Sequence, residues 1–235
     1  MKVNNLKLND RDFPTILRQI PSPPKELFWI GTHPGEFLDK PRVAIVGSRK
    51  VSAYGRAVTE RLAGELAKAG VVIVSGLALG VDSIAHQAAL DSGGLTIAVL
   101  PTSLDQIYPA SHLNLARQIA ASGGCLICEY PPGAEAFVSN FIARNRLVSG
   151  LADVLLITEA AKNSGTMHTA GFALEQGRTV MAVPGNINSS GSEGCNNLIK
   201  TGAAPVTGAD DVFFALGLDP GVQQQTKIFR GSDNE

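Results

Sequence analysis

Two alternating patterns of apolar and polar residues run along most of the chain. Short, nearly continuous apolar runs are typical of strands covered on both faces. They occur at 43–46, 71–74, 96–100, 125–129, 154–158 and 179–183. Between them, apolar residues recur with helical spacing, at 55–69, 82–90, 113–121, 137–151, 166–176 and 194–200. The alternation predicts an extended Rossmann-like α/β fold: a doubly wound, mainly parallel sheet with helices on both faces.

The two ends of the chain depart from this alternation. Residues 1–40 are predicted to be an N-terminal extension that packs on the core, and 27–30 is a candidate edge strand within it. Residues 41–217 are predicted to form the Rossmann-like core domain, with a short last helix starting at Asp210 or Asp211. From residue 218 to 235 the chain is polar and rich in glutamine, so we expect a flexible tail.

Composition narrows the class of protein without identifying it. Hydrophobic residues make up 44% and charged residues 17% of the 235 residues, as in ordinary globular proteins. The net charge of −1 argues against a wide basic face for duplex DNA but leaves room for a local basic groove. No apolar run is long enough to span a membrane, and the N-terminus lacks an apolar signal core. We therefore expect a cytoplasmic protein with no membrane partner.

The cysteines add little chemistry to this picture. Their number is three, and an odd count fits a reducing compartment. Cys125 and Cys128 have the spacing of a redox pair, but they fall in a predicted strand and not at the start of a helix. We interpret them as packed strand residues. Neither a metal site nor a cofactor is predicted.

The most informative stretch is 141–185, which joins a predicted helix, a buried strand and a second helix. Its polar residues stand on the first helix, at the end of the strand and in the turn that opens the second helix. They are Arg144, Asn145, Arg146, Glu159, Lys162, Ser164, Gly165 and Thr166. Guanidinium groups beside a helix N-terminus with free backbone amides form a place to hold phosphate. The stretch therefore predicts a phosphate-bearing ligand.

Two earlier turns also follow predicted strands. Their residues are Gly47, Ser48 and Arg49 after the first strand, and Ser75 and Gly76 after the second. Ligands of open α/β sheets bind outside the carboxyl ends of the strands, so these turns should converge with residues 159–166 on one edge. The glycine spacing is not that of a dinucleotide-binding turn, and no acidic residue ends the second strand. A nicotinamide cofactor is therefore not expected.

Several side chains near this edge have alternative roles. Asp82 is expected to cap the helix that follows, and His86 one turn later to be hydrogen-bonded instead of binding a metal. Tyr108 either stacks on a base or packs over its own loop. Arg144 and Arg146 diverge by about 200° on a helix. One should therefore face the ligand while the other makes a structural pair, and we expect Arg144 to face the ligand.

Taken in order, these motifs resemble those of the DprA/Smf family of DNA-processing proteins over about residues 11–210. They are VAIVGSR at 43–49 with YG at 54–55, SGLALGVD at 75–82 with AH at 85–86, ICEYPPG at 127–133, FIARNR at 141–146, EA at 159–160, SGT at 164–166, and AVPG at 182–185 with GCN at 194–196. The resemblance implies dimers that bind single-stranded DNA and load the RecA recombinase in natural transformation and recombination, with no established catalytic step.

The resemblance also carries contacts with phosphates and a base to particular residues. These are Gly47, Ser48, Arg49, Arg144, Asn145, Lys162, Ser164, Gly165 and Thr166. The sequence departs from the family pattern after the third strand, where Pro101, Thr102 and Ser103 stand in place of a glycine-rich turn. We expect a minimal core without the C-terminal winged-helix-like domain or the N-terminal helical domain that other members carry.

Two alternatives from other classes stay open. The same stretch is similar, more distantly, to the LOG-type nucleotide phosphoribohydrolases, which carry acidic residues directly after the Gly-Thr of the helix start. Here Met167, His168 and Thr169 follow, so a carboxylate for glycosidic cleavage is missing and we predict a non-enzymatic protein. A nucleotide-sensing domain is the other alternative. For the expected homodimer, 213–216 is a candidate patch, with core packing as its alternative role.

Overall fold

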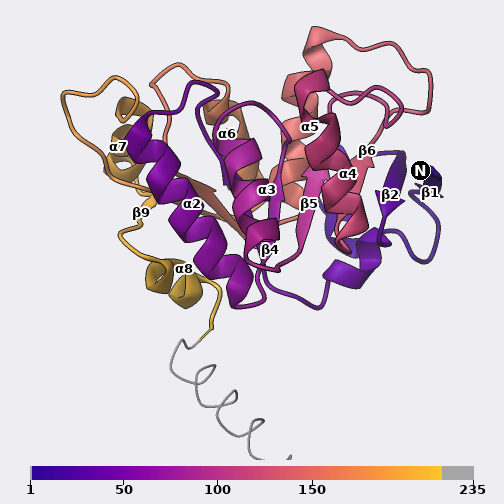
Figure 1. Cartoon of the computed structure of the whole chain (residues 1–235), viewed down its shortest axis with the longest axis horizontal. Coiled ribbons are helices and arrows are strands. Elements are labelled where there is room, and N and C mark those ends of the chain that lie inside the picture. The colour runs from indigo at the N-terminus through magenta and orange to yellow at the C-terminus, as the bar shows by residue number, and fades with distance from the viewer. Residues whose placement is uncertain (1, 219–235) are drawn as a thin grey trace, which may run out of the picture.

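The computed structural model describes residues 2–218, in which one nine-stranded sheet is flanked by helices (Figure 1). The strands are β1 (Asn4–Lys7), β2 (Glu26–Gly31), β3 (Arg42–Val46), β4 (Val72–Ser75), β5 (Thr96–Val99), β6 (Cys125–Cys128), β7 (Val154–Ile157), β8 (Thr179–Ala182) and β9 (Ala204–Pro205). Their order is β1-β2-β6-β5-β4-β3-β7-β8-β9, antiparallel at β1–β2 and β2–β6 and parallel elsewhere. The predicted α/β fold with a mainly parallel sheet is confirmed.

The α-helices follow the strands in alternation. They are α1 (Thr15–Arg18), α2 (Ala53–Lys68), α3 (Val81–Asp91), α4 (Leu113–Ala121), α5 (Val138–Gly150), α6 (Thr166–Glu175), α7 (Glu193–Lys200) and α8 (Ala209–Ala215). Short 3-10 turns occupy Pro34–Phe37 and Ala110–His112. None of the helices within residues 2–218 is long and apolar enough to cross a membrane.

The central strand β3 shows why the sheet is covered on both sides. Successive side chains of a strand point to opposite faces. Val43 and Ile45 pack in a cluster with residues of α2, α3 and α8, whereas Ala44 and Val46 pack in another cluster with residues of α5, α6 and α7. In Figure 1, α2, α3 and α4 lie over the near face of the sheet, and α5 and α6 lie behind it. Both faces are thus removed from water.

The N-terminal extension joins the sheet itself. The expectation that 27–30 forms an edge strand is wrong, because β1 pairs with the outer side of β2 and becomes the edge. The four residues Leu27–Ile30 are all buried, as in an internal strand. Arg42 at the start of β3 ties the extension to the core, since its guanidinium pairs with Asp153 at 2.7 Å and donates to the Phe37 carbonyl at 3.0 Å.

The start of α3 differs from its prediction. Asp82 does not cap the helix, which begins after Gly80 without a side-chain cap. Its carboxylate accepts hydrogen bonds from the N–H groups of Gly76 at 3.0 Å and Ala78 at 3.4 Å, so it closes the preceding turn instead. Gly80 has a φ of +78°, a left-handed conformation that favours glycine. The carboxylate is thereby placed beneath the carboxyl end of β4.

The prediction that His86 is a hydrogen-bonded helix residue is confirmed. Its Nδ1 lies 2.7 Å from the Thr96 hydroxyl, which in turn donates to the Ile73 carbonyl at 2.7 Å. Because the hydroxyl proton points at Ile73, Nδ1–H of His86 is the donor to Thr96. Burial, and then the nearby charges of His112 and Arg144, lower the pKa of His86 to about 3. The imidazole is therefore neutral in the folded protein at neutral pH.

This neutral histidine should make the protein sensitive to acid. A group whose folded pKa is lowered binds a proton more readily when unfolded, so its contribution is present above pH 6.5 and is lost as pH falls toward 3. From pH 7 to pH 5 we expect the free energy of unfolding to fall by about 2 kcal/mol from His86 alone. Urea unfolding of the wild type and His86→Gln at both pH values isolates this effect, and equal pH dependence in the two proteins would contradict it.

The remaining sequence expectations concern the cysteines and the C-terminus. Cys125 and Cys128 lie in β6 as buried free thiols, and burial raises the pKa of Cys128 to about 12. The last helix begins at Ala209, one residue before Asp210 and two before Asp211, the two predicted starts. Apart from Leu218, the predicted tail 218–235 lies outside the described residues. The division into an extension and a core domain remains a prediction.

Candidate nucleic-acid interface

A hollow of about 610 Å³ opens at the carboxyl ends of β3, β4 and β7, and we call it the carboxyl-edge hollow. Its lining includes Val46, Gly47, Ser48, Arg49, Lys50, Gly76, Ala78, Asp82, Phe141, Ile142, Arg144, Asn145, Val148, Ala161, Ser164, Gly165, Thr166, Thr169, Ser190 and Gly191. The chain leaves β3 for α2 on one face and leaves β7 for α6 on the other. Such a reversal between adjacent strands opens a crevice at their carboxyl ends.

The turn after β3 is packed closely against its neighbours. The Ser48 N–H donates to the Glu159 carbonyl at 2.8 Å, and the Ser48 carbonyl accepts from the Val81 N–H at 3.1 Å. A Cβ atom on Gly47 would lie 2.7 Å from that same Glu159 carbonyl oxygen. Any larger residue would push the turn away from β7. The small residues therefore fix the backbone that carries Arg49 to the rim.

Two cations and two aromatic rings stand at this rim. Arg49 and Lys50 are exposed, and neither forms an ion pair with any of residues 2–218. The Arg49 guanidinium lies 5.9 Å from the centre of the Phe141 ring, and that ring meets Tyr108 edge-on at 5.0 Å between centroids. Tyr108 as a residue is 51% exposed. The rim thus offers charge for phosphates and π-faces for bases.

Arg144 forms part of the floor and is held by backbone carbonyls. Its Nη1 donates to the carbonyls of Gly76, at 2.6 Å, and Val99. Since the carboxylate of Asp82 accepts from the Gly76 N–H, two buried side chains of opposite charge hold the same residue. A Cβ atom on Gly76 would lie 2.6 Å from the Arg144 Cζ, so only glycine permits this approach.

Burial and mutual attraction set the charge states of this pair. Burial raises the pKa of Asp82, and the positive charge of Arg144 opposes that rise. Burial lowers the pKa of Arg144 to about 10, and the charge of Asp82 opposes that fall. Arg144 therefore stays protonated at neutral pH. It contributes a fixed positive charge to the floor, with its donors directed mainly at carbonyl oxygens.

The N-terminus of α6 forms the facing wall. Ser164, Gly165 and Thr166 line the hollow there, and no side chain in the described part of the chain caps the helix. The Ser164 hydroxyl is buried and has no hydrogen-bond partner among the described residues. The first amides of a helix lack intrahelical acceptors, and the helix dipole adds positive potential at this end. The wall is therefore suited to an anion such as phosphate.

The structure brings together nine of the thirteen residues predicted for the site. The four outside the lining are Ser75, Arg146, Glu159 and Lys162. Ser75 is buried and donates to the Ile45 carbonyl, whereas the Glu159 carboxylate accepts from the Ser52 N–H at 3.0 Å. Arg146 pairs with Glu129 at 2.6 Å, and Lys162 is exposed beside the hollow. Of the two arginines on α5, only Arg144 reaches the floor.

Sequence reasoning assigned no role to several lining residues. Lys50 follows Arg49 directly, and adjacent cations after a strand were a usable signal. Phe141 stands three positions before Arg144, a spacing that places both on one face of a helix. Its contact with Tyr108 joins residues 33 positions apart and had no signal in the sequence. Ser190 and Gly191, from the loop before α7, were also missed.

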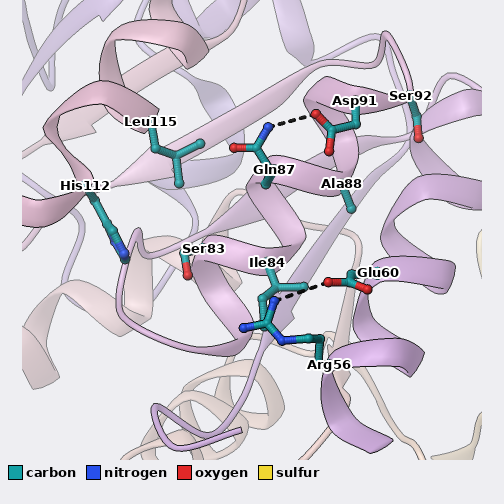
Figure 2. Close-up of a pocket in the computed structure, with 10 residues that line it drawn as sticks. All are labelled: Arg56, Glu60, Ser83, Ile84, Gln87, Ala88, Asp91, Ser92, His112 and Leu115. Carbon is teal, nitrogen blue, oxygen red and sulfur yellow. Dashed lines mark hydrogen bonds and ion pairs between the residues drawn. The ribbon is translucent and has the colours of Figure 1, made fainter. Parts of the chain in front are cut away.

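A separate hollow between α2, α3 and α4 has different chemistry (Figure 2). Its charged and polar groups are largely used within the protein. Arg56 pairs with Glu60 at 3.2 Å, Gln87 donates to Asp91 at 2.8 Å, and His112 Nδ1 lies 2.8 Å from the Leu77 carbonyl. Both signs of charge are present. This hollow is therefore less suited to phosphate than the carboxyl-edge hollow.

The fold and the carboxyl-edge hollow define an open α/β protein with a candidate anion-binding site at the switch point of a mainly parallel sheet. The chain belongs to the DNA recombination-mediator protein A family, whose family model matches residues 4–217. The resemblance of the sequence motifs to the DprA/Smf family is thereby confirmed.

Known relatives agree with this membership. The chain is 40% identical to Protein Smf of Synechocystis over 95% of its own length and 57% of the relative's. The X-ray structure of DNA processing protein A from Streptococcus pneumoniae matches with a TM-score of 0.83 and 39% identity, covering 91% of this chain and 74% of that one. A Helicobacter pylori DNA processing protein A structure, described for its unique single-stranded DNA binding mode, matches with a TM-score of 0.81 and 36% identity, covering 92% and 96%.

The length of the match differs among relatives. The chain spans 57% of the Synechocystis protein, so it corresponds to little more than half of that relative. The shared part contains the sheet and every residue that lines the carboxyl-edge hollow.

Proposed function

We propose that this protein binds single-stranded DNA in the carboxyl-edge hollow and acts as a mediator of DNA processing and recombination. The observation that carries the proposal is the meeting of Arg49, the Phe141 ring and the N-terminus of α6 around one hollow. Phosphates would be held by the cations and helix amides, and bases would stack on the Tyr108 and Phe141 rings. Membership in the family and the single-stranded DNA binding described for the Helicobacter relative support it.

The predicted site residues divide into two groups under this proposal. Direct contact with the strand is proposed for Gly47, Ser48, Arg49, Gly76, Arg144, Asn145, Ser164, Gly165 and Thr166. Ser75, Arg146 and Glu159 would support the surrounding turns through their own hydrogen bonds. Lys162 is exposed next to the α6 turn and would add to the local positive potential.

Salt dependence tests the proposal directly. Fluorescence-anisotropy titration of a labelled oligothymidylate should give an affinity that falls steeply with salt, with a slope of about −0.7 per phosphate contact in a plot of log affinity against log salt. A duplex of the same length is the control, and it should bind more weakly because its bases cannot reach Phe141 or Tyr108. Titrations that stay flat at low salt would overturn the proposal.

Binding without catalysis is the second part of the proposal. Asp82 is a carboxylate in the lining with a raised pKa, which is one feature of a hydrolase site. Its Oδ2 already accepts hydrogen bonds from two backbone N–H groups, which favours a structural role. Incubation with nucleoside monophosphates should release no free base. Release that disappears in Asp82→Asn would instead support the phosphoribohydrolase alternative.

Partners and cellular setting are proposed on family membership. We propose RecA recombinase as a protein partner, a homodimer as the working form and a cytoplasmic setting, in keeping with three buried free thiols. At the end of α8, Phe213 and the following Leu216 pack against the core, whereas Phe214 is 86% exposed and available for a second copy. Light scattering coupled to gel filtration should report a dimer in the wild type, and Phe214→Ser should weaken it if this patch is the interface.

A further inference from the structure

A second hollow adjoins the first across the loop 185–192, and we call it the Tyr54 hollow. It is lined by Ser52, Ala53, Tyr54, Pro184, Gly185, Asn186, Ser189 and Ser192. The same loop supplies Ser190 and Gly191 to the carboxyl-edge hollow. Neighbouring residues of a chain are only about 3.8 Å apart at Cα. The two hollows therefore meet along this loop, close enough for one continuous ligand to enter both.

The Tyr54 ring is held in place in the first turn of α2. Its hydroxyl donates to the Pro184 carbonyl at 2.8 Å, while half of the residue remains exposed. The first residue of the loop, Gly185, is also fixed by two hydrogen bonds to the Asn196 side chain. The Gly185 N–H donates to the Asn196 Oδ1 at 3.1 Å, and the Asn196 Nδ2 donates to the Gly185 carbonyl at 3.0 Å. A tethered aromatic ring loses little freedom when a ligand stacks on it. The Tyr54 ring is therefore already positioned for a flat ligand to stack on it.

The charge of the Tyr54 hollow differs from that of the first. The N-terminus of α2 would ordinarily attract an anion, but Ser52 caps it and the Glu159 carboxylate accepts from the Ser52 N–H at 3.0 Å. That carboxylate offsets the positive end of the helix. Within residues 2–218, no lysine or arginine lines the Tyr54 hollow, whose side-chain polar groups are hydroxyls and an amide. A phosphate has no cation to meet there, whereas an uncharged base does have a ring to stack on.

We infer that a single strand held by its phosphates in the carboxyl-edge hollow continues across the loop 185–192 and stacks a base on Tyr54. This inference rests on the proposed single-stranded DNA binding and extends its footprint. The first hollow supplies electrostatic attachment, and the second supplies stacking that does not depend on sequence. The chemistry that selects the ligand at Tyr54 is an unpaired nucleobase, so a duplex gains nothing from it.

Strand length provides the test. Anisotropy titrations with oligothymidylates from about 4 to about 16 nucleotides compare the wild type with Tyr54→Ala and Tyr54→Phe. The alanine variant should bind long strands on the order of tenfold more weakly and the shortest strands as well as the wild type does. Tyr54→Phe keeps the ring and loses only the bond to Pro184, so it should stay close to the wild type. An equal loss at every length would show a structural role and overturn the inference, as would no loss at all.

A strand lacking a single base locates the contact. One abasic position moved along a long strand should weaken wild-type binding most at the nucleotide that reaches Tyr54. Tyr54→Ala should show no further loss with that same strand, because the two changes remove one interaction. Additive losses would overturn the inference while leaving single-strand binding intact. A wild type that binds no strand of any length would overturn the proposed function together with the inference.

Discussion

Arg144→Met is expected to lower the free energy of unfolding by about 2–6 kcal/mol, because two buried carbonyl oxygens lose their donor at a cost of about 1–3 kcal/mol each. The change leaves the Gly76 and Val99 carbonyls without their donor and removes the charge that compensates Asp82. Methionine fills a similar volume, so loss of packing contributes little. Urea unfolding followed by circular dichroism measures the difference.

The partner of Arg144 supplies the control. Asp82→Asn removes the buried charge but keeps an acceptor for the Gly76 and Ala78 amides. If the two charges act as a pair, the double variant Arg144→Met/Asp82→Asn should lose clearly less stability than the sum of the single changes. Arg144→Lys retains the charge without the planar fork and should fall between the wild type and methionine. Additive effects would show that Asp82 and Arg144 do not stabilise one another.

The same contacts divide the site into a fixed part and a contact part. Asp82 and Arg144 are buried and hydrogen-bonded to backbone groups at the carboxyl ends of β4 and β5. The buried Glu159 accepts a hydrogen bond from the Ser52 N–H at the start of α2. Arg49 and Lys50 are exposed and without ion pairs within residues 2–218. Arg144 is proposed to reach the strand as well, but most of its donors already serve the fold, whereas the exposed cations have all of theirs. Stability and affinity should therefore respond to different substitutions.

The sequence predicted the central sheet because each of its strands carries its own signal. The run 154–158, for example, is apolar up to its last residue, Thr158, and becomes β7 (Val154–Ile157), buried on both faces. β1 was missed because only Leu6 among its four residues is buried, and a single apolar residue cannot show the alternating pattern of a strand. The edge position of 27–30 was wrong for the same reason: the strand that covers it could not be recognised.

The candidate site was predictable for residues that directly follow a predicted strand in the sequence. Gly47 to Arg49 and Ser164 to Thr166 follow strands, and topology alone brings strand ends together. The burial of Arg144 was not predictable, since its acceptors Gly76 and Val99 lie 68 and 45 positions away. Nor could the role of Asp82 be foreseen, because capping the next helix and closing the previous turn require the same residue type at the same place.

Arg49→Ala is expected to weaken binding to single-stranded DNA by roughly 10- to 100-fold, the effect of losing one charge-assisted hydrogen bond of about 1.5–3 kcal/mol. It should also make the salt slope shallower by about 0.7, because one phosphate contact is lost. Arg49 is exposed and outside the hydrogen-bonded floor, so the free energy of unfolding should change by no more than about 0.5 kcal/mol. Anisotropy titrations across a salt series, with urea unfolding of the same samples, measure all three quantities.

Arg56→Ala is the matched control for this experiment. Arg56 has a 57% exposed side chain, pairs with Glu60 and lines the hollow of Figure 2 instead of the carboxyl-edge hollow. Both substitutions remove one positive charge, so a general loss of electrostatic attraction would weaken the two variants alike. If the strand is held by Arg49 at the hollow, only Arg49→Ala loses affinity and salt slope. Equal losses would place the strand outside the carboxyl-edge hollow, with attraction spread over the whole surface.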